Sequence, residues 1–226
     1  MESVRVVLFD VNETLSDMTP LQRRFEQLGV PAELFRVWFA SVLRDGFALT
    51  AAGGYAGFGE IAGAVLRDLF AGLHHWDGDP ARAAQQVLDG FAELDVHPDV
   101  PDGVRRMRAA GLRLATLTNG AVNLSEQLLD RAGIREQFEV LLDVSGARAW
   151  KPAAAAYQYA LGELHAEPSE TMLVAVHPWD ITGARAAGLQ AAWLRRGAGD
   201  YPPTMTEPTV AAADMRDLAH LLTEPA

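Results

Sequence analysis

The sequence predicts an α/β protein built on a doubly wound parallel sheet, with a helical insert after the first strand. From about residue 95 onward, short apolar runs alternate with stretches of helical periodicity, which is typical of βαβ units. Between residues 15 and 94 strand signals vanish, and apolar residues recur at intervals of three and four, as on one face of a helix. We therefore expect an α/β core formed by residues 1–14 and 95–226 and a helical cap formed by residues 15–94.

The first strand is expected over residues 4–9, where a continuous run of β-branched and apolar residues is bounded by polar ones. Such a run suits a strand that is buried on both faces of a parallel sheet. Further strands are expected, with a weaker signal for the last, over residues 112–117, 138–142, 172–176 and 191–194. The core helices are expected between them, over residues 104–110, 124–132, 153–164 and 181–187. In the insert, helical spacing is clearest over residues 34–42 and 61–70, and turns are expected at residues 53–54 and 76–80.

Composition and charge exclude several classes of function. The chain has 226 residues, of which 49% are hydrophobic, yet no uninterrupted apolar run approaches the ~18–20 residues of a membrane span. The N-terminus lacks the features of a signal peptide, so we expect a cytoplasmic protein with no membrane partner. The formal charge of −11 argues against a nucleic-acid partner, and the absence of cysteine excludes disulfides, thiolate zinc sites and cysteine nucleophiles. A small-molecule substrate is therefore expected, and a homodimer is left open.

Polar residues follow four of the expected strands, where the carboxyl edge of a parallel sheet gathers functional groups. They are Asp10, Thr118-Asn119-Gly120, Lys151-Pro152 and the stretch from His177 to Asp180. Each has a structural explanation when taken alone, because Asp commonly caps a helix and Thr-Asn-Gly commonly forms a turn. Together they favour a site in which an ammonium group keeps a carboxylate ionised as a nucleophile, while hydroxyl, amide and backbone donors hold substrate oxygens.

The segment from Phe9 to Leu15 resembles the first motif of the haloacid dehalogenase superfamily, a nucleophilic Asp followed four residues later by Thr. Thr118-Asn119 resembles the second motif, Lys151-Pro152 the third, and Asp180 the acidic position of the fourth. The resemblance extends over nearly the whole chain. It implies a Rossmann-like core with a helical cap, and the catalytic residues it indicates are Asp10, Thr14, Lys151 and Asp180.

Two features favour a dehalogenase over a phosphatase within this superfamily. Phosphatases of this kind usually carry Asp-x-Asp, but the second position here is Asn12, which cannot protonate a leaving alkoxide. The fourth motif offers one carboxylate, Asp180. Together with Asp10 it gives only two anionic ligands, few for Mg²⁺, which prefers octahedral coordination by oxygen. By contrast, residues 151–157 and 179–185 closely resemble the type II L-2-haloacid dehalogenases, which are metal-free. No metal and no cofactor are therefore expected.

The resemblance implies that Asp10 displaces halide from C2 of a small 2-halocarboxylic acid with inversion. Water then hydrolyses the resulting aspartyl ester, with Lys151 and Asp180 placed to orient and activate it. The substrate carboxylate is expected to bind the backbone N–H of Val11 together with Thr118 and Asn119. The other predicted substrate contacts are Asn12, Phe39, Tyr157, His177 and Trp179.

Some residues depart from the family pattern. Phe39 follows Trp38 where the family usually has an Arg that faces the halide, and Arg36 partly shares its helix face. Ala175 and His177 stand where Ser and Asn are usual, and His177 is expected to contact halide or a substrate oxygen, or else to be a structural cap. Glu13 replaces the usual Gly, without an evident role. A small-molecule phosphatase that uses Asp10, and a binding protein that has lost turnover, remain the alternatives.

Overall fold

The computed structural model describes residues 3–197 and 199–224, and its centre is a six-stranded parallel sheet. The strands are β1 (Val6–Phe9), β2 (Arg113–Thr118), β3 (Val140–Asp143), β4 (Thr171–Ala175), β5 (Gln190–Leu194) and β6 (Val210–Ala212). Their order is β3-β2-β1-β4-β5-β6, so the chain reverses its direction of strand addition between β1 and β4. Ligands of open α/β sheets bind at such a switch point, beyond the carboxyl ends of the strands. The end of β1 is therefore the natural position for a functional group.

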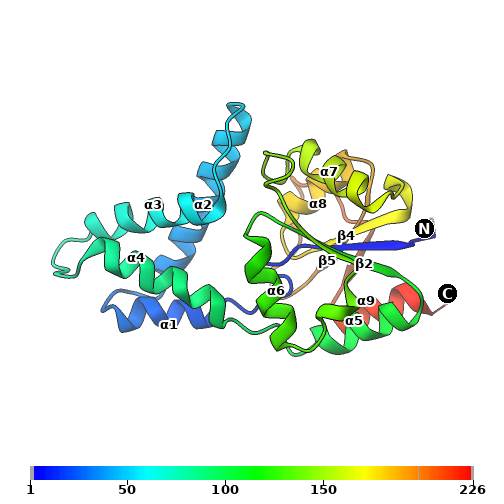
Figure 1. Ribbon diagram of the computed structural model, residues 1–226, viewed down its shortest axis with the longest axis horizontal. Coiled ribbons are helices and arrows are strands. Elements are labelled where there is room, and N and C mark those ends of the chain that lie inside the picture. Colours follow the sequence, from blue (N-terminus) through cyan, green and yellow to red (C-terminus); the bar gives the residue numbers. More distant parts are fainter. Residues whose placement is uncertain (1–2, 198, 225–226) are drawn as a thin grey trace.

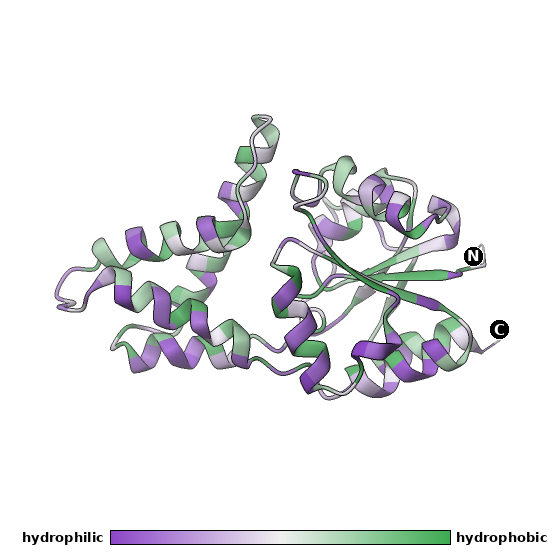
Figure 2. Cartoon of the chain, in the orientation of Figure 1, coloured by the Kyte–Doolittle hydropathy of each residue, from purple (hydrophilic) through white to green (hydrophobic). Residues whose placement is uncertain are grey.

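Helices cover both faces of the sheet, as a doubly wound fold requires (Figure 1). They are α5 (Val100–Ala109), α6 (Val122–Arg131), α7 (Ala154–Leu164), α8 (Pro178–Ala186) and α9 (Met215–Thr223). In the view of Figure 1, α7 and α8 lie above the sheet, and α5 and α9 lie below it. Figure 2 shows that the strands between them are mostly hydrophobic, whereas the helices carry hydrophilic residues outward. The predicted fold class is confirmed.

Several predicted boundaries of the core were wrong, and its last strand and last helix were not predicted. Helix α8 begins at Pro178 instead of residue 181, and α5 begins at Val100 instead of residue 104, with a Pro in the first turn of each. Proline is tolerated there because the first N–H groups of a helix have no intrahelical partner. Strand β6 has three residues, too few for a periodic signal, and is defined by its pairing with β5. Helix α9, which packs against α5, was also not predicted.

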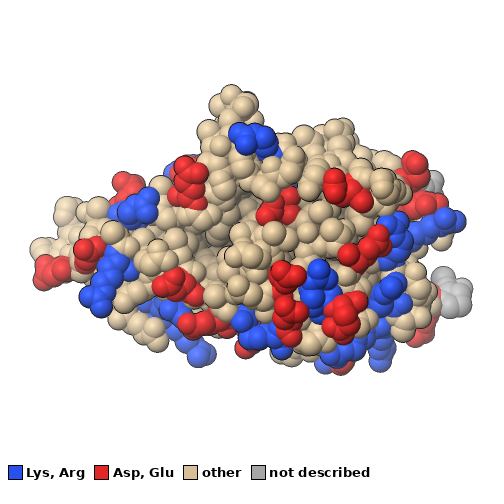
Figure 3. All heavy atoms as spheres, in the orientation of Figure 1, with Lys and Arg blue, Asp and Glu red and all other residues tan. Residues whose placement is uncertain are grey.

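Residues 19–93 form a bundle of helices beside the core (Figure 1). It comprises α1 (Thr19–Gln27), α2 (Leu34–Ala51), α3 (Phe58–Ala71), α4 (Pro80–Asp89) and a 3-10 helix (Gly90–Glu93). Aromatic rings fill its centre. The ring centroid of Phe25 lies 5.9 Å from that of Phe70 and 6.2 Å from those of Phe35 and Trp38. Figure 3 shows acidic and basic side chains interspersed over the visible face of both parts of the molecule.

Two linkers join the helical bundle to the core, and they run side by side. The backbone N–H of Asp17 donates to the carbonyl of Asp95 (2.9 Å), and that of His97 donates to the carbonyl of Leu15 (2.9 Å). Ser16 and Val96 form an isolated β-bridge between them. The first linker follows directly after the loop that carries Asp10, so the nucleophile candidate and the hinge of the bundle are contiguous in the chain.

Trp150 fastens the bundle to the core at a second place. Its indole N–H donates to the carbonyl of Ala56 (3.0 Å), and its backbone N–H donates to the hydroxyl of Thr50 (3.1 Å). The indole is 1% exposed and lies against Gly46 of α2, where a Cβ atom would come within 2.4 Å of the ring. The bundle is thereby held over the carboxyl edge of the sheet.

Among the described helices, we find none with the length and apolarity needed to cross a membrane.

Candidate active site

Asp10 lies at the carboxyl end of β1, 3% exposed, with both carboxylate oxygens engaged. Lys151 Nζ donates to Oδ1 (2.9 Å), and the Thr14 hydroxyl donates to Oδ2 (2.7 Å). Thr14 is itself held by the backbone N–H of Val176, which donates to its Oγ1 (3.1 Å). Burial alone raises the pKa of Asp10, but the charge of Lys151 and these hydrogen bonds hold the pKa below its ordinary value. Asp10 is thus an ionised, oriented carboxylate.

Lys151 bridges two carboxylates at the centre of the site. Its Nζ also donates to Asp180 Oδ2 (2.6 Å), and the Tyr157 hydroxyl donates to Asp180 Oδ1 (2.6 Å). Lys151, Asp180 and Tyr157 are each 0% exposed. Burial raises the pKa of Asp180, and the negative charge of Asp10 adds to this, whereas Lys151 opposes it. The pKa values of two neighbouring carboxyl groups are therefore shifted in opposite directions. Such a difference assigns different roles to chemically identical groups.

Asn119 lies in the site, but its amide binds the protein backbone. Its Oδ1 accepts from the backbone N–H of Lys151 (2.9 Å), and its Nδ2 donates to the carbonyl of Lys151 (3.1 Å). The residue predicted to hold substrate thus fixes the loop that presents the ammonium group. Sequence reasoning found Asn119 but could not find this partner, because the two residues are 32 positions apart.

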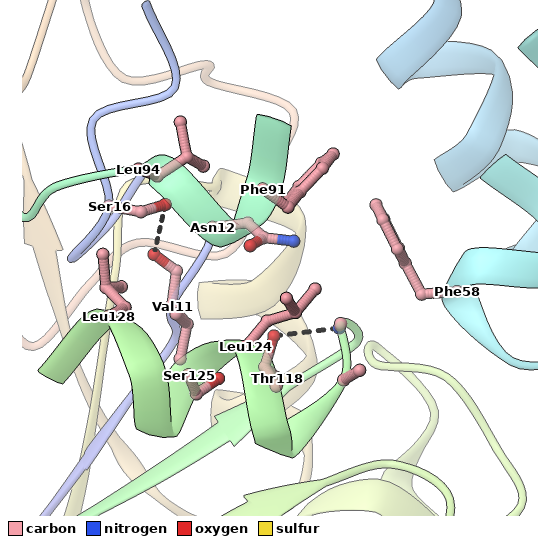
Figure 4. A pocket seen from close by; sticks show the side chains of 12 residues that line it. Val11, Asn12, Ser16, Phe58, Phe91, Leu94, Thr118, Leu124, Ser125 and Leu128 are labelled. Carbon is pink, nitrogen blue, oxygen red and sulfur yellow. Dashed lines mark hydrogen bonds between the residues drawn. The ribbon is translucent and has the colours of Figure 1, made fainter. Parts of the chain in front are cut away.

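A small hollow lies beside this centre, between the core and the helical bundle (Figure 4). Val11, Asn12 and Thr118 line it from the core side, and Phe58 and Phe91 line it from the bundle side. The Thr118 hydroxyl accepts from the backbone N–H of Gly120 (2.9 Å), which leaves its own hydrogen free to donate. Phe58 and Phe91 were not predicted as site residues, because in sequence they are ordinary apolar positions of a helical stretch.

On the other side of Asp10, a group of rings lies between α2 and the start of α8. His177 stacks on Trp179 (ring centroids 4.9 Å apart, planes at 16°), and Phe39 lies 6.4 Å from His177. Trp179 also contacts Phe47 of α2, with the ring centroids 5.1 Å apart. The structure thus brings the predicted residues Phe39, His177 and Trp179 together next to the nucleophile candidate.

Glu13 lies at the edge of this group. Its carboxylate Oε2 is 3.7 Å from His177 Nε2, and its side chain is 39% exposed. Partial burial raises the pKa of Glu13, whereas His177 opposes this effect. Its backbone is left-handed (φ 62°), a region that is strained for any residue with a Cβ atom and costs ~1–3 kcal/mol. Glycine adopts this conformation without strain, and nothing in the structure explains why this chain has Glu here.

The donor set does not fit a divalent metal. Asp10 and Asp180 are the acidic groups of the centre, and the Lys151 ammonium lies between them at 2.9 and 2.6 Å. A cation is therefore already present where a metal would have to bridge the two carboxylates. Among the residues described, no group of three or more His, Asp or Glu side chains could hold an ion.

Comparison with known proteins adds four findings. The family of haloacid dehalogenase-like hydrolases matches residues 4–188. An (S)-2-haloacid dehalogenase of Pseudomonas sp. (strain YL) is 28% identical over 198 residues, which cover 87% of this chain and 84% of the relative. Haloacetate dehalogenase H-2 of Moraxella sp. (strain B) is 25% identical over 224 residues, which cover 98% of this chain and 99% of the relative. A crystal structure of an L-2-haloacid dehalogenase, 28% identical, superposes with a TM-score of 0.90 over 98% of this chain and 100% of the other.

Proposed function

The chain belongs to the haloacid dehalogenase-like hydrolase family, and from this premise we propose that it hydrolyses the carbon–halogen bond of small 2-haloalkanoic acids. The observation that carries the proposal is the triad of Asp10, Lys151 and Asp180, in which one buried ammonium holds a nucleophilic carboxylate and a second, more basic one. The names of the relatives, which are haloacid dehalogenases, agree with it.

In the first step, a carboxylate oxygen of Asp10 attacks C2 of the substrate from the side opposite the halogen. The C2–O bond forms as the C2–halogen bond breaks, and the halide leaves with the bonding electron pair. The carbon centre is therefore inverted. Because Lys151 and Thr14 fix the carboxylate, the attacking oxygen is already oriented when the substrate binds.

In the second step, water attacks Cγ of the Asp10 ester. Asp180 accepts a proton from this water, a role that suits a carboxylate whose pKa is raised by burial. As the Cγ–O bond to the substrate breaks, Asp180 passes this proton to the departing oxygen, and the 2-hydroxy acid leaves. The second proton of the water is lost to solvent as Asp10 is regenerated as a carboxylate. Tyr157 holds Asp180 in position throughout (2.6 Å).

We assign the substrate carboxylate to the hollow of Figure 4, which Val11 and Thr118 line, with the Val11 backbone N–H and the Thr118 hydroxyl as its donors. Phe58 and Phe91 of the helical bundle cover this hollow and shield it from water, so residues 15–94 act as the cap. Water exclusion strengthens the electrostatic interactions within a site. The cytoplasmic location and the homodimer remain predictions.

Halide release from 2-chloropropionate tests the proposal, with Asp10→Asn as the control variant. We expect Asp10→Asn to keep the fold and to lose at least ~10²-fold in rate, because the amide lacks the nucleophilic oxygen of the carboxylate. Single turnover in water labelled with heavy oxygen should place the label in Asp10, because water attacks Cγ and not C2.

Label that appears only in the product would show direct attack by water and would contradict the ester mechanism. The phosphatase alternative is checked in parallel by phosphate release from small phosphate esters with added Mg²⁺. Phosphate release without halide release would replace the proposed function.

A further inference from the structure

His177 is the polar side chain that lies against Phe39, beside the nucleophile. Its Nε2 is 3.8 Å from Asp10 Oδ2, 3.7 Å from Glu13 Oε2 and 3.3 Å from the carbonyl oxygen of Asn12. The Asn12 carbonyl oxygen can only accept, so the hydrogen bond at 3.3 Å has Nε2 as its donor, whereas the two carboxylate oxygens lie beyond hydrogen-bond distance.

Several neighbours stabilise positive charge on this ring. The Glu13 and Asp10 carboxylates attract it, and Trp179 offers its π-face at 4.9 Å. Two cations oppose them. Lys151 Nζ lies 5.9 Å from the Trp179 ring, and Arg36 of α2 lines the same hollow as Glu13 and His177. Lys151 is already paired with two carboxylates, so its charge is largely balanced within the triad.

Glu13 is placed for this ring at a conformational cost. Its left-handed backbone (φ 62°) is a conformation that glycine adopts without strain. The carboxylate nevertheless extends to His177 in a hollow that Phe39 and Leu43 of α2 line from the other side. Strained backbone of this kind persists where surrounding interactions determine it, and it clusters at functional sites.

We propose that His177, held by Glu13, is the hydrogen-bond donor to the departing halide. The inference rests on the proposed function. As Asp10 forms the C2–O bond and the C2–halogen bond breaks, the halogen takes the electron pair and becomes an anion. The Nε2–H of His177 turns from the Asn12 carbonyl to hydrogen-bond this anion, and the proton stays on the nitrogen. Phe39 supplies only an apolar wall, so the donor to the halide comes from His177 of the core.

This arrangement favours substrates with a poor, strongly hydrogen-bonding leaving group. Fluoride is the smallest halide and the strongest hydrogen-bond acceptor among them, so its departure depends most on a donor. Bromide leaves readily without one. The sensitivity of the rate to His177 should therefore increase from 2-bromopropionate through 2-chloropropionate to 2-fluoropropionate.

Two substitutions separate the donor from its positioning residue. His177→Phe keeps a ring that can stack on Trp179 but removes Nε2, and Glu13→Gly removes the carboxylate together with the backbone strain. We expect His177→Phe to lower kcat for the fluoro substrate ~10²–10³-fold, the usual effect of deleting one donor to developing charge, and to lower it less for the bromo substrate.

Glu13→Gly should lower halide release while raising the Tm, a combination that a merely structural role does not produce. Glu13→Gln tests the charge at unchanged shape, and it should lower halide release as well. His74→Phe and Glu60→Gln, at exposed positions of the helical bundle, are the matched controls and should leave the rates unchanged.

A second readout does not require turnover. Chloride binding to the wild type, measured by chloride NMR line broadening, should weaken in His177→Phe, because the variant lacks the Nε2 donor. If His177→Phe releases all three halides at the wild-type rate, or loses the same factor in rate for all three, the inference is overturned. If the wild type releases no halide from any substrate, the proposed function fails instead. Chloride binding that does not depend on His177 then overturns the inference too.

Discussion

Gly46→Ala is a substitution in the helical bundle that should damage a site it does not touch. Gly46 lies inside α2, and a Cβ atom there would lie 2.4, 2.5 and 2.6 Å from three carbon atoms of the Trp150 indole. The indole cannot move aside freely, because it is 1% exposed and bonded to the carbonyl of Ala56. Trp150 directly precedes Lys151, so a displaced indole shifts the backbone that presents the ammonium group.

The magnitude follows from two opposing effects. Replacing Gly by Ala inside a helix stabilises by about 1 kcal/mol, whereas overpacking a filled site costs about 1–3 kcal/mol. Gly162→Ala in α7 isolates the first effect, because nothing lies within 4 Å of its added Cβ atom. The two variants should therefore differ by about 1–3 kcal/mol in the free energy of unfolding, at about 2–4 °C in Tm per kcal/mol for a chain of this size.

Thermal unfolding and the rate of halide release provide the assay. Gly162→Ala should match or exceed the wild-type Tm with unchanged kcat. Gly46→Ala should have the lower Tm, and its kcat should fall ~10²-fold if the catalytic groups shift by about 1 Å. A Gly46→Ala variant with the Tm of Gly162→Ala and full activity would refute the reasoning, since it would show that Trp150 accommodates the methyl group.

Three further predictions concern charges. Lys151→Ala leaves Asp10 and Asp180 buried without their shared cation, so we expect loss of activity and ~3–5 kcal/mol of destabilisation by denaturant unfolding; near-wild-type stability would contradict the buried triad. Halide release should be unchanged by EDTA, because Lys151 lies where a metal would bridge the carboxylates; collapse in EDTA and recovery with Mg²⁺ would contradict the donor-set argument. Partial burial raises the pKa of Asp99, but hydrogen bonds from Arg196 and the backbone outweigh this effect and lower the pKa overall. The contribution of Asp99 to stability is therefore present above its ordinary pKa of 3.8 and is lost as the pH falls through the pKa of the folded state. Stability of Asp99→Asn should thus fall less steeply below pH 4 than that of the wild type, and an unchanged acid limb would exclude this contribution.

The general location of the site was predictable from the sequence because parallel strands end at one edge of a sheet. Asp10 and Asp180 come shortly after apolar runs and Lys151 comes after a longer loop, and the structure joins the three through a single ammonium group. That Tyr157 is the partner of Asp180 was not evident from the residues alone. Its hydroxyl reaches across 23 positions, and helical spacing carries no information about such a contact.

What the sequence could not provide is the pairing of residues from separate elements. Phe58 and Phe91 have the periodicity of ordinary core residues, and only the docking of the bundle makes them part of a hollow. The fit of Trp150 against Gly46 depends on two elements 104 positions apart. Glu13 was noticed as unusual, but its left-handed backbone and its distance to His177 are properties of the folded loop.

The paired linkers have a consequence for protein engineering. Because the backbone nitrogen of Asp17 and the carbonyl oxygen of Asp95 are 2.9 Å apart, the helical bundle leaves and re-enters the core at nearly the same point. A graft that replaces residues 19–93 with the corresponding segment of a relative therefore has to close this narrow gap and to restore the contacts that Trp150 makes with Gly46, Thr50 and Ala56. The transplanted segment would bring its own counterparts of Phe39, Phe58 and Phe91, while Asp10, Lys151 and Asp180 stay in the recipient. We expect a set of such chimaeras to differ in substrate range while they share one unchanged reaction centre.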